Sequence, residues 1–414
     1  SAFLLLFSLI EKGQATETYR PETSVAGFIQ LPGSGRQVYN FNPGWRFFRG
    51  DVRGAEVVNF DDRSWNVVST PHTVELMPAE GSGCRNYQGP AWYRKHFVLP
   101  AETKGQRVVL HFEAAMGKQI LYLNGKRIQE HLGGYLPFTL DLTANGVQAG
   151  DSCLLAVFTD NSDDKSYPPG KRQYTLDFAY HGGIYRDVWM IAKSPVAITD
   201  AIDSQTVGGG GVFIHFDKIS EKSAQVYVNT EVQNDDARSE SVTVETTLTD
   251  ADGKVIKRSS GKLSLKPGEK KSICQQMEVK NPTLWSPDTP YLYRVQSRIK
   301  KGNKSIDGGI TRVGIRLAEF RGKDGFWLNG KPFGQLVGAN RHQDFAYVGN
   351  ALPNSQQWRD AKRLRDAGCT IIRVAHYPQD PAFMDACDEL GLFVIVATPG
   401  WQYWNKDPKF GELV

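Results

Sequence analysis

The strongest constraint on the fold is a change in hydrophobic pattern near residue 317. Downstream of it, apolar runs alternate with segments whose apolar residues recur at helical spacing: 334–344, 354–368, 370–378, 381–391 and 392–400. Asn354 or Ser355 is a candidate N-cap of the first helix, Gly368 follows that helix, and Pro381 opens the second. This order of strands and helices predicts a parallel sheet with right-handed crossovers.

Upstream of residue 317 the pattern is that of an all-β chain. Residues 38–195 contain short alternating apolar runs, which predict an all-β sandwich. Asn124-Gly125, between two such runs, predicts a two-residue hairpin turn. Residues 196–316 return to short strands after a run of glycines, and their length fits an immunoglobulin-like sandwich.

Charge and cysteine content exclude several classes of protein. The net charge of +4 arises from 49 basic and 45 acidic residues spread along the chain, without a polybasic block, so nucleic acid is not an expected partner. The 5 cysteines are widely spaced and include no Cys-x-x-Cys pair. Neither a disulfide framework nor a zinc site built on cysteine is therefore predicted.

The N-terminal segment, residues 1–37, begins with the apolar stretch AFLLLFSLI. This stretch is too short to span a membrane as a helix. The following residues, with Gly13 and Ala15 placed like a cleavage site, indicate the remnant of a secretory signal and hence a secreted or periplasmic protein. An ordinary N-terminal strand or helix is the alternative.

Polar side chains follow each of the apolar runs downstream of residue 317. They are residues 340–344 after the first run, Arg373, His376 and Tyr377 in the second, and 398–401 after the third. In a (β/α) barrel the carboxyl ends of the strands converge on the active-site face. A lone charge is costly to bury, so Arg373 within its strand is expected to need a carboxylate partner.

Several motifs occur together in a specific order. The stretches that carry this order are YLNGKRIQEHLGGYLPFTLDLT, HGGIYRDVWMI, LWSPDTPYLYRV, FWLNGKPFGQLVGANRHQD and IRVAHYP followed by FMDACDELGLFVI. They resemble, across residues 40–414, the sugar-binding jelly roll, the immunoglobulin-like domain and the first barrel segments of glycoside hydrolase family 2. The resemblance implies a multidomain chain that ends in about three of the eight strands of a TIM barrel, residues 317–414.

Members of that family are retaining glycosidases, which use two glutamates about 5–5.5 Å apart. By resemblance the acid/base follows the fourth barrel strand in an Asn-Glu pair, and the nucleophile follows the seventh. No Asn-Glu dipeptide occurs in this chain, so both glutamates are expected beyond Val414 and no catalytic residue is assigned before it. The 414 residues are therefore expected to be part of a longer enzyme and to be inactive alone.

The resemblance assigns roles to residues outside the catalytic pair. His376 and His342 would bind sugar hydroxyls, Arg373 would orient the nucleophile, and Asp177 would reach from the jelly roll to the sugar. A satisfied core histidine or a structural ion pair is the alternative for each. Asn340 and Arg341 are further candidates for the site. Trp401, Tyr403 and Trp404 are expected either to stack on sugar rings or to pack against a further barrel strand. The residues expected to be structural are Asp344, Tyr377, Trp92, Trp285 and the pair Arg186–Asp187.

The resemblance also limits cofactor and substrate. Several β-galactosidases carry metal-binding acids after the third strand, where this chain has VATPGW, so no metal site and no cofactor are predicted. The expected substrate is a β-linked oligosaccharide, with galactose first because of the Asn-Arg-His stretch. A β-glucuronidase, a β-mannosidase or a non-catalytic carbohydrate-binding protein are the alternatives, and homo-oligomer formation is left open.

Overall fold

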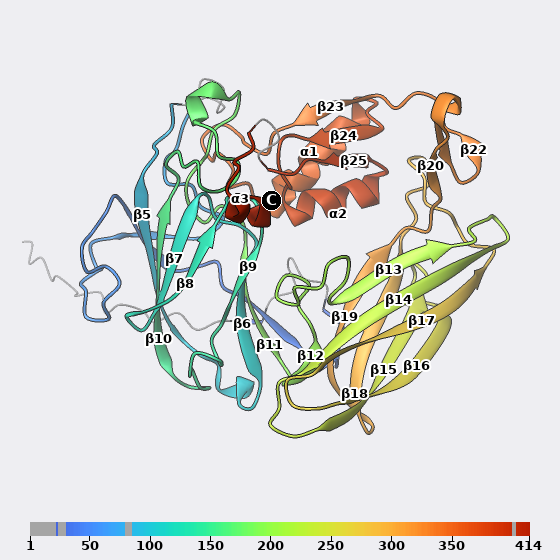
Figure 1. Ribbon diagram of the computed structural model, residues 1–414, viewed down its shortest axis with the longest axis horizontal. Coiled ribbons are helices and arrows are strands. Elements are labelled where there is room, and N and C mark those ends of the chain that lie inside the picture. Colours follow the sequence, from blue (N-terminus) through green and yellow to red (C-terminus); the bar gives the residue numbers. More distant parts are fainter. Residues whose placement is uncertain (1–21, 24–29, 79–84, 400–402) are drawn as a thin grey trace, which may run out of the picture.

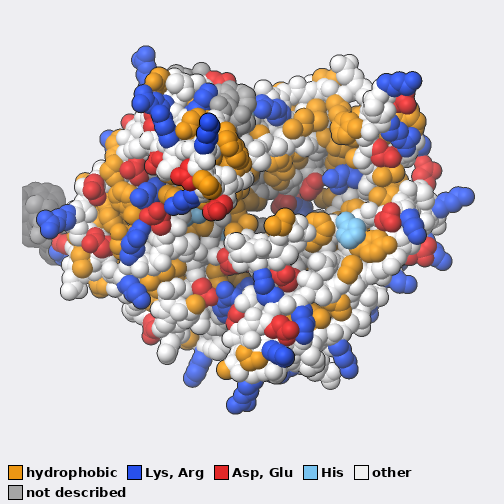
Figure 2. Space-filling view, in the orientation of Figure 1, with side chains coloured by type: hydrophobic (Ala, Val, Ile, Leu, Met, Phe, Trp, Pro, Cys, Tyr) orange, Lys and Arg blue, Asp and Glu red, His pale blue; other side chains and the backbone are white. Residues whose placement is uncertain are grey.

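The computed structural model describes residues 22–23, 30–78, 85–399 and 403–414. Figure 1 shows two β-sandwiches and, above the second, a parallel sheet with helices. The N-terminal apolar stretch, Cys84 and Trp401 lie outside the described residues. Within the described part, no helix combines the length and the apolar character needed to cross a membrane. Acidic and basic side chains are interspersed on the face in Figure 2, as the charge pattern predicts.

The first β-sandwich consists of two antiparallel sheets whose inner faces form one core. One sheet has the order β1 (Glu22–Thr23), β2 (Gln37–Asn40), β11 (Val188–Lys193), β6 (Arg107–Phe112), β9 (Phe138–Asp141). The other has the order β4 (Asn66–Val68), β3 (Trp45–Arg49), β5 (Pro90–Val98), β10 (Ser152–Asp160), β7 (Lys118–Leu123), β8 (Lys126–Leu132). Asn124 and Gly125 adopt φ of 50° and 82° between β7 and β8, which is the predicted hairpin turn.

The second β-sandwich also pairs two antiparallel sheets. In one, β14 (Ser223–Asn234) pairs with β12 (Val196–Ile198), β13 (Val212–Asp217) and β17 (Lys270–Lys280). The other has the order β16 (Val255–Leu265), β15 (Glu240–Thr249), β18 (Tyr293–Lys301), β19 (Lys304–Val313). Buried residues alternate with half-buried ones along β14 and with exposed ones along the second half of β17, so one face of each strand enters the core.

A small sheet connects the second sandwich to the parallel sheet. It contains β20 (Ala318–Phe320), β21 (Phe326–Leu328) and β22 (Lys331–Pro332). The parallel sheet has the order β23 (Gly338–Arg341), β24 (Ile371–Val374), β25 (Phe393–Val396), with helices α1 (Asn354–Asp366), α2 (Pro381–Leu390) and α3 (Pro408–Leu413). Short 3-10 helices lie at η1 (Ala101–Thr103), η2 (Gln173–Thr175) and η3 (Gly322–Asp324).

The parallel sheet is covered on one face only. Side chains of α1 and α2 pack on Ile372 and Val374 of β24 in a single core cluster. Apolar side chains at the strands' far side and edges, Val337 (54%), Ile395 (51%) and Val396 (53%), remain exposed. Figure 2 shows hydrophobic side chains over this region. The described strands therefore form the first part of a barrel, not a closed barrel.

The helix ends follow the predicted signals except at one position. Pro381 occupies the first turn of α2, Asp380 caps it through Ala382 N at 2.8 Å, and Gly391 closes it with φ of 77°. The N-cap prediction for α1 was wrong: Pro353 occupies that position, and the Asn354 amide donates to Asp187 Oδ2 at 2.9 Å instead. A tertiary partner thus replaces the local cap.

The second sandwich holds α2 through a buried tryptophan and an ion pair. Trp285 is buried, as predicted, and its Nε1 donates to Asp388 O at 2.9 Å. Arg312 lies 3.2 Å from Asp385 and also pairs with Glu389. Trp92, the other tryptophan predicted to be structural, is buried within the first sandwich.

Arg186 connects the first sandwich to the loops that follow β23 and β24. Its guanidinium, 2% exposed, donates to Gln343 Oε1 at 2.9 Å and to Pro378 O at 2.8 Å, and lies 3.9 Å from Asp380. The predicted pair of Arg186 with Asp187 is not formed. Asp187 instead accepts one hydrogen bond from the amide of Asn42 and one from the amide of Asn354, both at 2.9 Å.

Three buried carboxyl groups, those of Glu113, Asp187 and Asp380, share this interface with the guanidinium of Arg186. Burial, together with the charges of Asp380 and Asp187, raises the pKa of Glu113 well above its usual value. Burial also raises the pKa of Asp380, and it raises the pKa of Asp187 to about 6. The interface therefore favours the protonated forms of these groups.

Replacing Arg186 by methionine is expected to destabilise the protein by about 3–5 kcal/mol, because Asp380 would lose its buried cation and two acceptors would lose their donor. Chemical denaturation of the wild type and the variant measures this difference. Arg312→Met is the matched control: its ion pair is more exposed, so a loss of about 1 kcal/mol or less is expected. Equal effects of the two substitutions would contradict the assignment.

Stability is also expected to depend on the ionisation of Asp187. Its pKa is raised from 3.8 to about 6, so its contribution to stability is fully present below about pH 4 and is lost as the pH rises through 6. The loss amounts to at most about 3 kcal/mol. Melting temperatures of the wild type and of Asp187→Asn between pH 4 and 7 test this. The melting temperature of the variant should rise relative to that of the wild type as the pH increases. Parallel curves would show that Asp187 does not titrate in this range.

Candidate functional site

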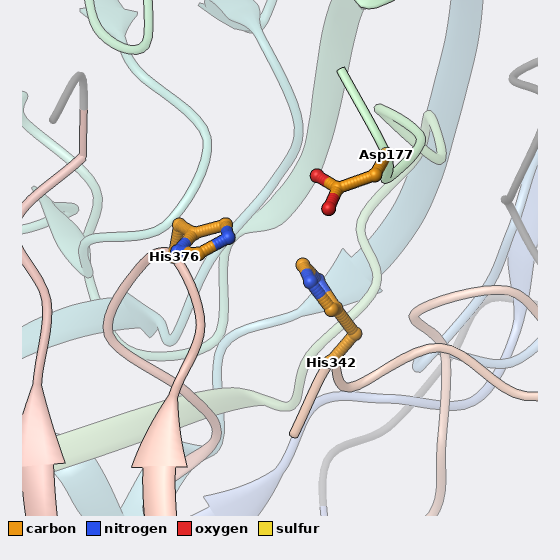
Figure 3. A group of neighbouring side chains, drawn as sticks. All are labelled: Asp177, His342 and His376. Atoms are coloured by element: carbon orange, nitrogen blue, oxygen red, sulfur yellow. The ribbon is translucent and has the colours of Figure 1, made fainter. Parts of the chain in front are cut away.

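Asp177, His342 and His376 come together from three segments that are distant in the sequence. Asp177 lies in the loop after η2, His342 directly follows β23, and His376 lies two residues beyond β24. Figure 3 shows the carboxylate and the two imidazoles pointing toward one another. Their candidate ligand atoms all lie within 4.8 Å of one another.

The parallel register of β23 and β24 explains why the two histidines meet. Asn340 pairs with Arg373 and Arg341 with Val374, so both strands end at the same edge of the sheet. Residues just beyond the carboxyl ends of neighbouring parallel strands share that edge. The first sandwich supplies Asp177 from the other side, so the site lies between two domains.

Aromatic side chains support the two imidazoles from behind. The Phe178 ring stacks on His342 with a centroid distance of 5.1 Å and lies 5.8 Å from His376. Tyr377 Oη lies 3.2 Å from His342 Nδ1, and the Tyr377 ring stacks on Tyr135 at 4.1 Å. Phe178, Tyr135 and Tyr377 are all buried, which restricts the rotamers available to the histidines.

Burial and neighbouring charges keep the imidazoles neutral. Burial lowers the pKa of both His342 and His376, and the positive charge of Arg373 lowers both further. Asp344 and Asp177 oppose this shift in the pKa of His342. At neutral pH each ring therefore offers one hydrogen-bond donor and one acceptor. The carboxylate of Asp177, on an exposed residue, offers two acceptor oxygens.

The remaining predicted site residues differ in position. Arg341 is buried on the helix side of the sheet, where it donates to Gln379 at 2.6 Å and Asp360 at 2.8 Å. Asn340 is exposed on β23, and Arg373 is half-buried on β24. The pairing of Arg373 with a carboxylate stays a prediction.

Aromatic residues after β25 were predicted to contact sugar or to pack against further barrel strands. Trp401 lies outside the described residues, so its role stays a prediction. Tyr403 and Trp404 both pack edge-on against Phe410 of α3, at centroid distances of 5.7 Å and 6.1 Å, and Trp404 remains exposed.

The two catalytic glutamates were predicted to lie beyond Val414. Val414 directly follows α3 and is 38% exposed. None of the described residues tests the placement of the glutamates, so it stays a prediction. The carboxylate that the structure does bring to the two histidines is that of Asp177, which belongs to the first sandwich and not to a barrel strand.

Sequence reasoning missed two kinds of residue. Phe178 stacks on His342 and lies beside His376, and only its position next to Asp177 could have indicated this role. Gln343 receives the hydrogen bond from Arg186, although it lies within the recognised stretch at 340–344. No metal site was predicted, although the ligand atoms of Asp177, His342 and His376 are close enough that the group could hold a metal ion.

Comparisons with known proteins place each part of the chain in one family. Three family models match consecutive segments of the chain. The glycosyl hydrolases family 2 sugar binding domain matches residues 57–195, the model described simply as glycosyl hydrolases family 2 matches residues 210–316, and the family's TIM barrel domain matches residues 320–410.

Individual relatives agree with these matches. A beta-galactosidase of Thermoanaerobacter pseudethanolicus is 35% identical over 89% of this chain and 47% of its own length. A beta-glucuronidase of Formosa agariphila is 32% identical over 91% of this chain and 39% of its own length. The structure of Bacteroides uniformis beta-glucuronidase 2 with a covalently bound cyclophellitol-6-carboxylate aziridine superposes with a TM-score of 0.82 at 32% identity, over 91% of this chain and 44% of that one.

The chain thus spans less than half the length of each of these relatives. The matched segments cover most of the first sandwich, most of the second and the parallel sheet, in that order along the chain. The chain belongs to the glycosyl hydrolases family 2.

Proposed function

We propose that this chain forms the sugar-binding side of the active site in a retaining exo-β-glycosidase. The observation that supports this proposal is the convergence of Asp177, His342 and His376 at the edge where β23 and β24 end. In a (β/α) barrel this edge belongs to the active-site face. The named activities of the relatives, beta-galactosidase and beta-glucuronidase, agree with a β-glycoside substrate.

Each side chain has a role that follows from its chemistry. The two oxygens of Asp177 accept hydrogen bonds from neighbouring hydroxyls of the terminal sugar. The neutral imidazoles of His342 and His376 each donate to one hydroxyl or accept from another. Phe178 holds both rings in place, so the donors are oriented before the sugar arrives. Contacts of this kind accelerate the reaction insofar as they tighten in the transition state.

Retaining hydrolysis also needs an acid/base and a nucleophile about 5–5.5 Å apart. We place both beyond Val414, in the part of the family's fold that this chain does not span. The half-buried guanidinium of Arg373, whose charge reaches both histidines, is the group proposed to orient the nucleophile. The parallel sheet, open on one face, is the surface on which the further strands would pack.

The terminal sugar is proposed to be galactose, with glucuronic acid as the second candidate. A relative named beta-galactosidase matches 89% of this chain at 35% identity, and a relative named beta-glucuronidase matches 91% of it at 32% identity. The described site contacts hydroxyls that both sugars carry, whereas recognition of a sugar carboxylate would need additional cationic or amide groups.

Chromogenic β-galactoside, β-glucuronide and β-mannoside distinguish these substrates. The 414-residue chain is expected to hydrolyse none of them, because the two catalytic carboxylates are proposed to lie beyond Val414. A longer protein that carries the remaining barrel strands should hydrolyse one of them preferentially. Hydrolysis by the 414-residue chain itself would require the acid and nucleophile to be found among its own carboxylates.

In the longer protein, Asp177→Asn and His376→Ala are each expected to lower kcat/KM by about 10- to 100-fold, since each removes a hydrogen bond of roughly 1.5–3 kcal/mol in the transition state. His215→Ala is the matched control, because His215 lies on the exposed face of β13 in the second sandwich. Unchanged kcat/KM in both site variants would remove these residues from the sugar site. Melting curves of all variants show whether the fold is retained.

A further inference from the structure

We propose that Asp177, His342 and His376 also form a binding site for one divalent transition-metal ion, with zinc as the best fit. We further propose that the bound ion excludes the sugar. The second statement rests on the proposed function, because it requires that the same side chains bind the sugar hydroxyls. The first statement concerns this chain alone.

The ligand types and their number match an open zinc site. Two imidazoles and one carboxylate are a ligand set that zinc uses when a fourth position is left for water. Zinc bonds of about 2.0–2.2 Å place tetrahedral ligands about 3.3 Å apart. The ligand atoms of Asp177, His342 and His376 lie within 4.8 Å of one another, so small side-chain rotations suffice. Asp177, which is exposed, has the freedom to make most of this adjustment.

The surroundings of His342 favour a metal ligand. Its Nδ1 lies 3.2 Å from Tyr377 Oη, which leaves Nε2 as the nitrogen for a further partner. In the tautomer whose Nδ1–H donates to Tyr377 Oη, Nε2 carries the lone pair and is the nitrogen that can bind a metal. The stacked Phe178 ring keeps the imidazole in this orientation.

The charges around the group limit the affinity and select the kind of ion. Asp177 and Asp344 attract a cation, whereas the positive charge of Arg373 opposes it at both histidines. We therefore expect micromolar rather than nanomolar dissociation constants for zinc. Calcium and magnesium prefer six or more oxygen ligands, so a site with two nitrogens and one carboxylate should not hold them.

Calorimetric titration of the 414-residue chain with zinc, after treatment with EDTA, tests the metal site directly. The wild type should bind one zinc ion, and calcium should give no heat of binding. Asp177→Asn, His342→Ala and His376→Ala should each weaken zinc binding by more than the roughly 10–100-fold that the loss of an outer-shell partner costs. Asp177→Asn is included because an exposed side chain can be changed with little risk to folding.

Two control variants address other zinc ligands in the chain. His215→Ala removes an exposed imidazole of β13, and Cys274→Ser removes an exposed thiol of β17. Both controls should bind zinc as the wild type does. Absence of zinc binding to the wild type at millimolar concentration, or unchanged binding in all three site variants, would overturn the metal site.

Sugar binding with and without zinc distinguishes a failure of this inference from a failure of the proposed function. Binding of galactose and of glucuronic acid is measured in EDTA, then again with saturating zinc. Sugar binding that zinc abolishes supports both statements of the inference. Sugar binding in EDTA without any zinc binding overturns the metal site and leaves the proposed function intact. If zinc and sugar bind at the same time without competition, the proposed exclusion is wrong. The sugar must then bind somewhere other than these three side chains.

Discussion

The geometry of the site depends on the buried guanidinium of Arg186. This one group, on the first sandwich, donates to Gln343 beside His342 and to Pro378 in the loop after His376. The loop that carries Asp177 belongs to the same sandwich, so Arg186 links that sandwich to the loops that carry both histidines. A planar guanidinium can hold two acceptors at once, which a lysine ammonium at this position would not do with the same fixed geometry.

This contact between domains carries an electrostatic cost. Glu113, Asp187 and Asp380 are buried close to one another, and the pKa of each is raised because their charged forms are poorly solvated. Good geometry at Asp187, with two amide donors at 2.9 Å, offsets part of that cost. The interface therefore contributes precise placement of the site more than it contributes stability at neutral pH.

The fold was largely predictable because its signals are local. Alternating apolar residues, the Asn124-Gly125 turn and the capping signals of α2 each act within a few residues, and the structure shows all of them. The convergence of His342 and His376 was also predictable, since parallel strands bring their carboxyl ends to one edge.

The supporting contacts were not predictable, because they join residues that no local pattern connects. Arg186 was expected to pair with its neighbour Asp187, yet both side chains find partners across the interface. Asn354 was expected to cap α1 from its place at the start of that helix. Its amide donates to the buried carboxylate of Asp187 instead. A buried carboxylate needs hydrogen-bond donors, and the tertiary fold can supply them from distant segments. The free energy of satisfying the carboxylate outweighs the local preference of Asn for a capping position.

The pairing of neutral imidazoles with a carboxylate suits two different occupants. Sugar hydroxyls need donors and acceptors in fixed positions, and a transition metal needs lone pairs at similar spacing. Arg373 distinguishes between them, because its charge repels a cation from both histidines while it attracts a carboxylate such as a glycosidase nucleophile. A carboxylate placed beside Arg373 would partly neutralise that repulsion. The same step that completes the catalytic site would thus strengthen the attraction of the site for a metal ion, which makes competition between metal and sugar a consequence of the site's own chemistry.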